Sequence, residues 1–124
     1  MCRRGVRVGF QVHTREIGRA LVVEAVGKLT LTDGHTKLRD VIYVSTSDGI
    51  RRFIVNLARV DAIDSYGIGE LARCYALVRR AGGQMKLACA SARVLQALRI
   101  SRLDSVFEMH WREDAALQAF DPGA

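Results

Sequence analysis

The feature that most constrains the fold of this chain is a turn between an apolar run and a segment with helical periodicity. Residues 53–57 are apolar enough for a buried strand, and after Ser65 the apolar positions recur at helical spacing. These positions are Ile68, Leu71, Ala72, Tyr75 and Val78. The sequence therefore predicts that a strand leads into this turn and that a helix follows it over residues 66–81. A strand joined in this way to a helix is the repeating unit of α/β sheets.

The residues of the turn favour the binding of an anion. Asp64 and Ser65 are both good N-cap residues, which accept hydrogen bonds from the free N–H groups of the first helical turn. Gly67 and Gly69 allow a partner's backbone to approach closely, and the helix N-terminus carries a partial positive charge. A phosphate on Ser65 would be stabilised there. Helix capping alone is the commoner role of such a pattern, so the turn by itself does not establish a functional site.

An alternation of strand and helix extends along the chain. Residues 6–13 alternate between apolar and polar, which predicts a strand that a turn over residues 14–18 joins to a second strand, 20–26, as an antiparallel hairpin. The later expected elements are, in order, a helix capped by Thr32 or Asp33 and ending near Ser47, a strand over 52–57, the helix over 66–81, a strand over 84–89, a helix capped by Ser91, a strand over 106–109 and a helix over 113–120. Trp111 is expected to pack under the last helix.

This alternation predicts an α/β fold. We expect a mixed, mainly parallel β-sheet of about five strands with about four helices, which cover at least one face of the sheet. A length of 124 residues and a single proline favour one domain over residues 1–124, with ragged ends at about 1–4 and 121–124. Partners of such sheets tend to bind at the carboxyl ends of the strands, which is where Ser65 falls.

Charge and cysteine content narrow the classes of partner. A net charge of +6 raises nucleic acid or a membrane surface as partners, but the basic residues are scattered and lack interleaved aromatic residues. We therefore expect no direct binding of nucleic acid, although an acidic protein surface would be steered towards this one.

Cys2, Cys74 and Cys89 have no metal-ligand spacing, and the histidines show none either. We expect no metal, no cofactor, no signal peptide and no membrane span, and the odd thiol count favours a reduced, cytoplasmic protein.

Several short motifs follow one another between residues 50 and 120. They are F-I-V-N-L at 53–57, I-D-S-Y-G-I-G at 63–69, R-A-G-G-Q-M-K-L at 80–87, S-A-R-V at 91–94 and I-S-R-L-D at 100–104. Together they resemble the STAS domain, the fold of bacterial anti-sigma factor antagonists, in which a strand carrying L-N-L leads into D-S-S-G-L-G. The resemblance implies a STAS-type single domain with Ser65 as the phosphoacceptor. It also implies that the partner-binding residues are Asp64, Tyr66, Gly67, Ile68 and Gly69.

Two positions depart from the family pattern. Tyr66 replaces the second serine of the turn motif, which leaves Ser65 aligned with the usual phosphoacceptor. Thr30 stands where the family's G-x-L-D has its acid, and Asp33 lies three residues further on. In the family that acid lies near the surface that meets the kinase, so its absence bears on the identity of the partner more than on the fold.

The resemblance implies an anti-sigma factor antagonist, a phosphorylation-switched module that sequesters an anti-sigma factor serine kinase and so releases a sigma factor. An alternative is a constitutively bound STAS scaffold subunit of a stressosome-like sensory or lipid-transport complex, which Tyr66 favours slightly. A third hypothesis, Ser65 as a catalytic nucleophile, is disfavoured because Ile63 breaks the G-x-S-x-G pattern and no histidine and acid are placed to activate the hydroxyl. We therefore expect a binding protein and not an enzyme, with a weak homodimer left open.

Overall fold

The computed structural model describes residues 10–31 and 36–120 of the chain. Within these ranges it contains five strands, four α-helices and one short 3₁₀-helix. In chain order they are β1 (Gln11–Ile17), β2 (Ala20–Leu29), α1 (Lys37–Ser47), β3 (Arg52–Ile63), α2 (Ser65–Arg80), β4 (Gln84–Ala88), α3 (Ala92–Ile100), η1 (Leu103–Ser105), β5 (Glu108–His110) and α4 (Glu113–Gln118). The predicted α/β class and the predicted numbers of strands and helices are confirmed.

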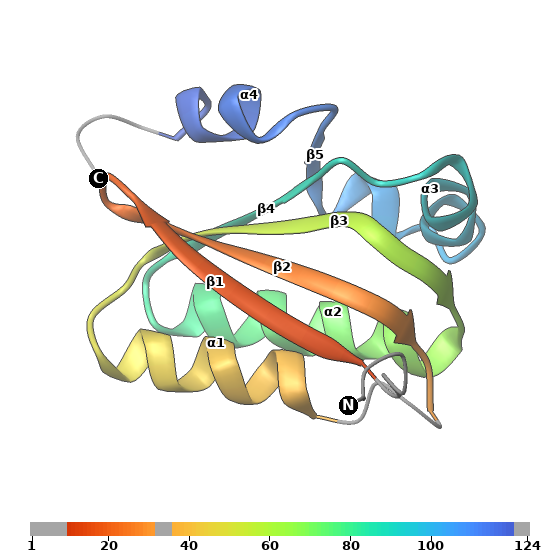
Figure 1. The fold of residues 1–124 in the computed structure, drawn as a ribbon, viewed down its shortest axis with the longest axis horizontal. Helices are drawn as coiled ribbons and strands as arrows, with labels where there is room; N and C mark the ends of the chain where they lie inside the picture. Colours follow the sequence, from red (N-terminus) through yellow and green to blue (C-terminus); the bar gives the residue numbers. More distant parts are fainter. Residues whose placement is uncertain (1–9, 32–35, 121–124) are drawn as a thin grey trace, which may run out of the picture.

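The strands form one sheet in the order β1-β2-β3-β4-β5. The hairpin strands β1 and β2 are antiparallel, and every other neighbouring pair is parallel, as expected when helices connect the strands. Helices α1 and α2 lie side by side on one face of the sheet, and α4 lies on the opposite face (Figure 1). The sheet is therefore mixed and mainly parallel, as predicted.

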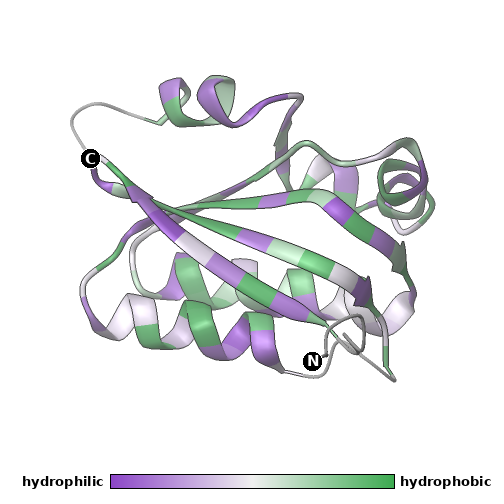
Figure 2. Ribbon diagram, in the orientation of Figure 1, coloured by the Kyte–Doolittle hydropathy of each residue, from purple (hydrophilic) through white to green (hydrophobic). Residues whose placement is uncertain are grey.

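The core is divided between the two faces because side chains alternate along each strand. On β3, Phe53, Val55 and Leu57 join the larger apolar cluster with α1 and α2, whereas Ile54 points to the other face. There it packs in a smaller cluster with Ala116 of α4 and with Phe120. Strand β2 is largely hydrophobic along its length, whereas the edge strand β1 is mostly hydrophilic (Figure 2).

The predicted end of the first strand is wrong, although residues 11–13 lie in a strand as expected. The strand expected over residues 6–13 is observed over Gln11–Ile17, and residues 6–9 lie outside the described residues. The turn expected over residues 14–18 is shorter, because Ile17 pairs directly with Ala20 and leaves a two-residue hairpin loop. Gly18 adopts a positive φ of 60° there, a conformation that two-residue hairpin loops require and that glycine adopts without strain.

Several other boundaries also differ from the predictions. Strand β2 continues past Gly27 to Leu29 through an irregularity in its pairing with β3, and β3 itself continues to Ile63. The expected cap at Thr32 or Asp33 lies outside the described residues, and α1 begins after Thr36. By contrast, Ser91 caps α3 as predicted, since its Oγ accepts a hydrogen bond from the N–H of Val94 at 3.2 Å.

The expectations for the C-terminal part are only partly confirmed. Strand β5 begins two residues later than expected, and α4 ends at Gln118, although Phe120 is buried as its apolar spacing suggested. The prediction that Trp111 packs under the last helix is wrong, because 79% of this residue is exposed. Phe120 fills that position under α4 instead, with the Lys86 ammonium 4.8 Å from the centre of its ring.

Candidate functional site

The predicted strand-to-helix turn is present and consists of a single linking residue. Strand β3 ends at Ile63 and α2 begins at Ser65, so Asp64 alone, in an extended conformation, joins the two elements. The turn lies at the carboxyl end of a strand that is parallel to both of its neighbours, next to the end of β2 (Figure 1). This is the edge at which parallel sheets commonly bind their partners.

Asp64 holds the turn together through both of its carboxylate oxygens. Its Oδ1 accepts a hydrogen bond from the N–H of Gly67 at 2.9 Å, and its Oδ2 accepts one from the N–H of Leu31 at 3.1 Å. Desolvation raises the pKa of this carboxyl, but hydrogen bonds from the N–H groups of Gly67, Leu31 and Tyr66 outweigh it and lower the pKa. Asp64 is therefore both the cap of α2 and a tether for the segment that follows β2.

Ser65 is the first residue of α2 and is exposed. Within the described part of the chain, its hydroxyl has no hydrogen-bond partner, because the capping role belongs to Asp64. The hydroxyl therefore stands at the positive end of a 16-residue helix with its oxygen available to a partner protein.

The neighbours of Ser65 form a partly apolar surface. Tyr66 and Ile68 are half-buried, as is Gly69, and Leu31 beside them is 61% exposed. The backbone of Leu31 is fixed by Asp64, so its side chain is presented next to the turn. Thr30, which stands where an acid was expected, comes directly after β2 and is half-buried. Leu31 was not predicted as part of the site, because no local sequence pattern brings it to Asp64.

Gly67 has a structural reason to be glycine. It is buried, and a Cβ at this position would lie 2.0 Å from the carbonyl oxygen of Leu29 and 2.9 Å from Cγ1 of Ile63. The first turn of α2 therefore packs directly against the backbone at the end of β2, which leaves no room for a side chain. Gly69 has no such constraint, since a Cβ there would meet only the flexible side chain of Arg73, at 3.2 Å.

A charge cluster around a buried glutamate lies about one turn further along α2. Glu70 is fully buried, and its carboxylate lies 3.4 Å from both Arg39 of α1 and Arg73 of α2. The Oε2 atom faces Nε of Arg39 without the alignment of a hydrogen bond. Sequence analysis did not identify this cluster, although Glu70 falls among the buried positions of α2, three residues after Gly67 and four before Cys74.

Cysteine chemistry and metal-ligand chemistry would be the two other kinds of site near this turn. Cys74 is buried on α2, and burial, with the nearby charge of Glu70, raises the pKa of its thiol to about 12. No group of three or more potential metal-ligating side chains comes together in residues 10–31 and 36–120.

None of the helices in these ranges combines the length and apolar character needed to cross a membrane.

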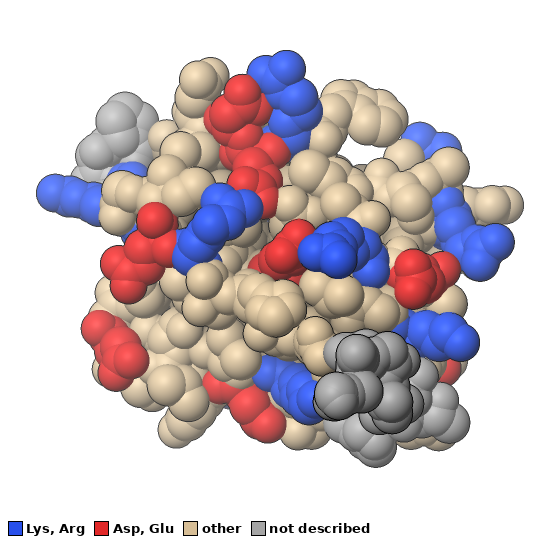
Figure 3. Space-filling model, viewed as in Figure 1, with Lys and Arg blue, Asp and Glu red and all other residues tan. Residues whose placement is uncertain are grey.

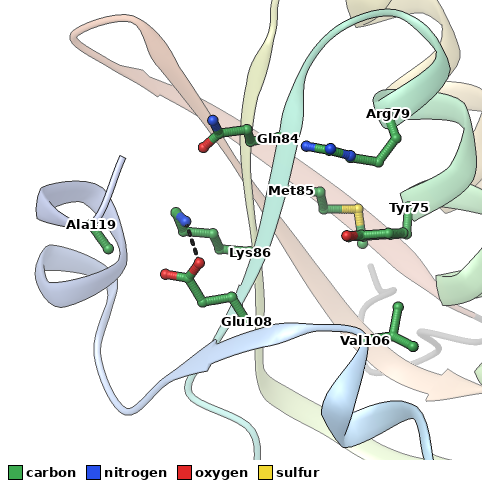
Figure 4. A pocket seen from close by; sticks show the side chains of 8 residues that line it. All are labelled: Tyr75, Arg79, Gln84, Met85, Lys86, Val106, Glu108 and Ala119. Atoms are coloured by element: carbon green, nitrogen blue, oxygen red, sulfur yellow. Dashed lines mark ion pairs between the residues drawn. The ribbon is translucent and has the colours of Figure 1, made fainter. Parts of the chain in front are cut away.

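A separate hollow of about 400 Å³ lies away from the turn, beside β4 (Figure 4). Tyr75 and Arg79 line it from α2, and Lys86 and Glu108 line it from the sheet. Lys86 is buried, and its Nζ lies 2.7 Å from the carboxylate of Glu108, so its charge is neutralised within the protein. Among the described residues that line the hollow, the buried charge of Lys86 is therefore already paired.

Comparison with known proteins places the chain in a family. The family model described as the STAS domain matches residues 11–116. The chain belongs to the STAS domain family. The match covers the hairpin, the whole parallel part of the sheet and the turn at Ser65, so the resemblance of residues 50–120 extends to the N-terminal strands as well.

Solved structures support the same STAS fold. A candidate anti-sigma factor antagonist of Thermotoga maritima is 16% identical with a TM-score of 0.79, covering 86% of this chain and 92% of its own. An anti-sigma factor antagonist from Mycobacterium paratuberculosis is 19% identical to this chain with a TM-score of 0.79. The match covers 90% of this chain and 93% of that protein. SpoIIAA of Bacillus is known in unphosphorylated and phosphorylated forms. The unphosphorylated form is 22% identical to this chain with a TM-score of 0.72, and the match covers 87% of this chain and 94% of SpoIIAA. At these identities the likeness establishes the fold.

Proposed function

We propose that this STAS domain is an anti-sigma factor antagonist that binds an anti-sigma factor serine kinase and is released when Ser65 is phosphorylated. The observation that carries the proposal is the exposed Ser65 hydroxyl at the start of α2, which the cap leaves without a hydrogen-bond partner in the described chain. The names of the similar solved structures, which are anti-sigma factor antagonists, support the same class of function.

The proposed contact surface is centred on the turn. Tyr66, Ile68 and Gly69 supply contact area around Ser65, and the exposed Leu31 extends this area towards the end of β2. Asp64 and Gly67 act by shaping the turn, since the first caps α2 and the second lets it approach Leu29. A kinase that docks here would desolvate the Ser65 hydroxyl at modest cost, because the hydroxyl is neutral.

Phosphorylation of Ser65 would raise the desolvation cost of docking the kinase. A phosphate adds about two negative charges to the centre of the contact surface. Burying those charges against an apolar or acidic kinase surface costs several kcal/mol even when one nearby charge partly neutralises them, because the desolvation of an ion pair can exceed its Coulombic gain. That cost is enough to dissociate a moderately tight complex. In this scheme Ser65 is the substrate of the partner, so the chain itself performs no catalysis.

The second candidate is a constitutively bound STAS scaffold subunit of a stressosome-like sensory complex or of a lipid-transport complex. Tyr66 favours it, because an aromatic side chain stands in the motif next to Ser65 and is half-buried at the proposed contact surface. The absence of an acid at Thr30 points in the same direction. The two candidates differ in whether binding depends on the charge at Ser65.

Binding measurements on two variants separate the candidates. Ser65→Ala should bind an anti-sigma factor kinase encoded beside this chain as tightly as the unmodified protein, whereas Ser65→Asp should bind at least about tenfold more weakly, since a charge is placed in the interface. Ser105→Asp adds the same charge at an exposed residue of η1 and serves as the control. Equal affinity of Ser65→Asp and the unmodified protein would favour the scaffold, and loss of binding by Ser65→Ala alone would contradict the switch.

A further inference from the structure

One side chain of α2 is placed to respond to a phosphate on Ser65. Ser65, Gly69 and Arg73 are spaced four residues apart, so they lie along one face of the helix. The Arg73 side chain is 55% exposed and runs back towards the N-terminus of the helix. Its Nη1 atom lies 3.2 Å from the point where a Cβ of residue 69 would stand. The guanidinium therefore occupies the surface over Gly69, about one helical turn from Ser65.

Because Gly69 has no side chain, position 69 does not separate the Arg73 guanidinium from Ser65. A larger residue at position 69 would stand between the guanidinium and the serine, because residues four apart are neighbours on a helix surface. A phosphate ester extends beyond the serine Oγ and brings three strong acceptor oxygens towards the same surface. The distance of about one turn, roughly 6 Å, is within the combined reach of the two groups.

The charge cluster around Glu70 leaves positive charge available. Two arginines, Arg39 and Arg73, share the single carboxylate of Glu70, each at 3.4 Å. Arg73 contacts Glu70 through Nη1 alone, and it makes no other hydrogen bond within the described residues. A guanidinium has five N–H donors in a planar fork that suits phosphate, so Arg73 keeps donors free while it remains near Glu70.

We propose that Arg73 binds the phosphate on Ser65 and so acts as its counter-charge within the antagonist. This inference rests on the proposed phosphorylation of Ser65. The carboxylate of Asp64, next to Ser65, opposes the phosphate charge, and the positive N-terminus of α2 and Arg73 both favour it. Arg39, on α1, contacts the other carboxylate oxygen of Glu70 and contributes at longer range. The bound phosphate is consequently more completely ionised near neutral pH than a free phosphoserine, which has a second pKa of about 6 and still carries some monoanion there.

The test is a ³¹P NMR titration of protein that carries phosphoserine at position 65. The phosphoserine is incorporated during translation at a reassigned stop codon, so the result does not depend on any kinase. The second pKa of the phosphate should be about 0.5 units or more lower in the otherwise unmodified protein than in the R73Q variant, because a nearby opposite charge favours the dianion and solvent exposure weakens that effect. R73K should give an intermediate value, because lysine keeps the charge and loses the fork.

The control variant is R80Q, which removes the same charge from an exposed position in the last turn of the same helix. It should leave the titration within about 0.1 units of the unmodified protein, since the distance along the helix exceeds the screening length at ordinary salt. Equal phosphate pKa values in the unmodified and R73Q proteins would overturn the proposal, and so would an R80Q shift as large as that of R73Q. A clear R73Q shift in a protein that no kinase phosphorylates would instead count against the proposed function alone.

Discussion

Gly67 and Gly69 stand two residues apart in the turn motif, yet the structure assigns them different constraints. Gly67→Ala should lower the free energy of unfolding by about 3 kcal/mol, because the new Cβ would stand 2.0 Å from the Leu29 carbonyl oxygen and force the strand and helix apart. Gly69→Ala is the matched control and should be neutral or stabilising by up to about 1 kcal/mol, since only the flexible Arg73 must shift and alanine favours the helix. Urea denaturation of both variants measures the two values, and a Gly67→Ala loss no larger than that of Gly69→Ala would contradict the packing described here.

Residue-scale prediction succeeded where local chemistry decides the structure. Asp64 and Ser65 were recognised as capping residues from their position before a helical pattern, and Asp64 is the residue that caps α2. The burial of Glu70 and its contact with Arg39 were not foreseen, because the partner belongs to α1, which is distant in sequence. The role of Gly67 was likewise assigned to partner contact, whereas its observed close contact is with the backbone of Leu29.

Among the elements, α4 is short and depends on side-chain contacts with the sheet. Glu113 at its start accepts hydrogen bonds from Arg15 of β1, at 2.7 Å, and from Asn56 of β3. Phe120, beyond its end, packs against the second face of the sheet beneath Lys86. These contacts join α4 to the sheet at both ends of a helix that has only six residues.

Phe120 and Trp111 provide a paired test of how the C-terminal segment packs. Phe120→Ala should destabilise the protein by about 3 kcal/mol, because it removes a buried aromatic side chain from the smaller apolar cluster. Trp111→Ala should change stability by less than about 0.5 kcal/mol, since the tryptophan is 79% exposed. The midpoints and slopes of urea unfolding curves give the free energy of unfolding of each variant. A larger loss of stability for Trp111→Ala than for Phe120→Ala would mean that the tryptophan is buried.

Element types were predictable from periodicity. Element ends were predictable where a capping residue marks them, as Ser91 does for α3, and several of the other ends were not. The strand-helix alternation from residue 52 onwards gives the observed order because each apolar face has a neighbour along the chain to cover it. The end of the first strand was predicted too early because β1 is an edge strand whose second half is exposed and polar, so the apolar alternation that ends at His13 dominated the prediction. Trp111 was misplaced because hydrophobicity alone does not show which of two nearby aromatic residues, Trp111 or Phe120, the last helix covers.

At the scale of the whole molecule, the sheet topology explains why the residues of the proposed site meet at one surface. Three parallel strand pairs and the helices between them place the ends of β2 and β3 at one edge, where Leu31 and Ser65 become neighbours through Asp64. On the face viewed in Figure 3, basic and acidic side chains are interspersed, and no continuous basic patch is present there. The basic side chains on this face are therefore dispersed and do not define a site on it.

The central claim is that Ser65 is a phosphoacceptor, and its most direct test is the intact mass of the protein, followed by peptide mapping. The protein is incubated with ATP and with each histidine-kinase-like ATPase encoded beside it, and Ser65→Ala is treated in parallel. We expect one added phosphate, located on Ser65, and none on Ser65→Ala. A stable complex with such an ATPase on a sizing column, with no phosphate added, would contradict the switch and would favour the constitutively bound scaffold.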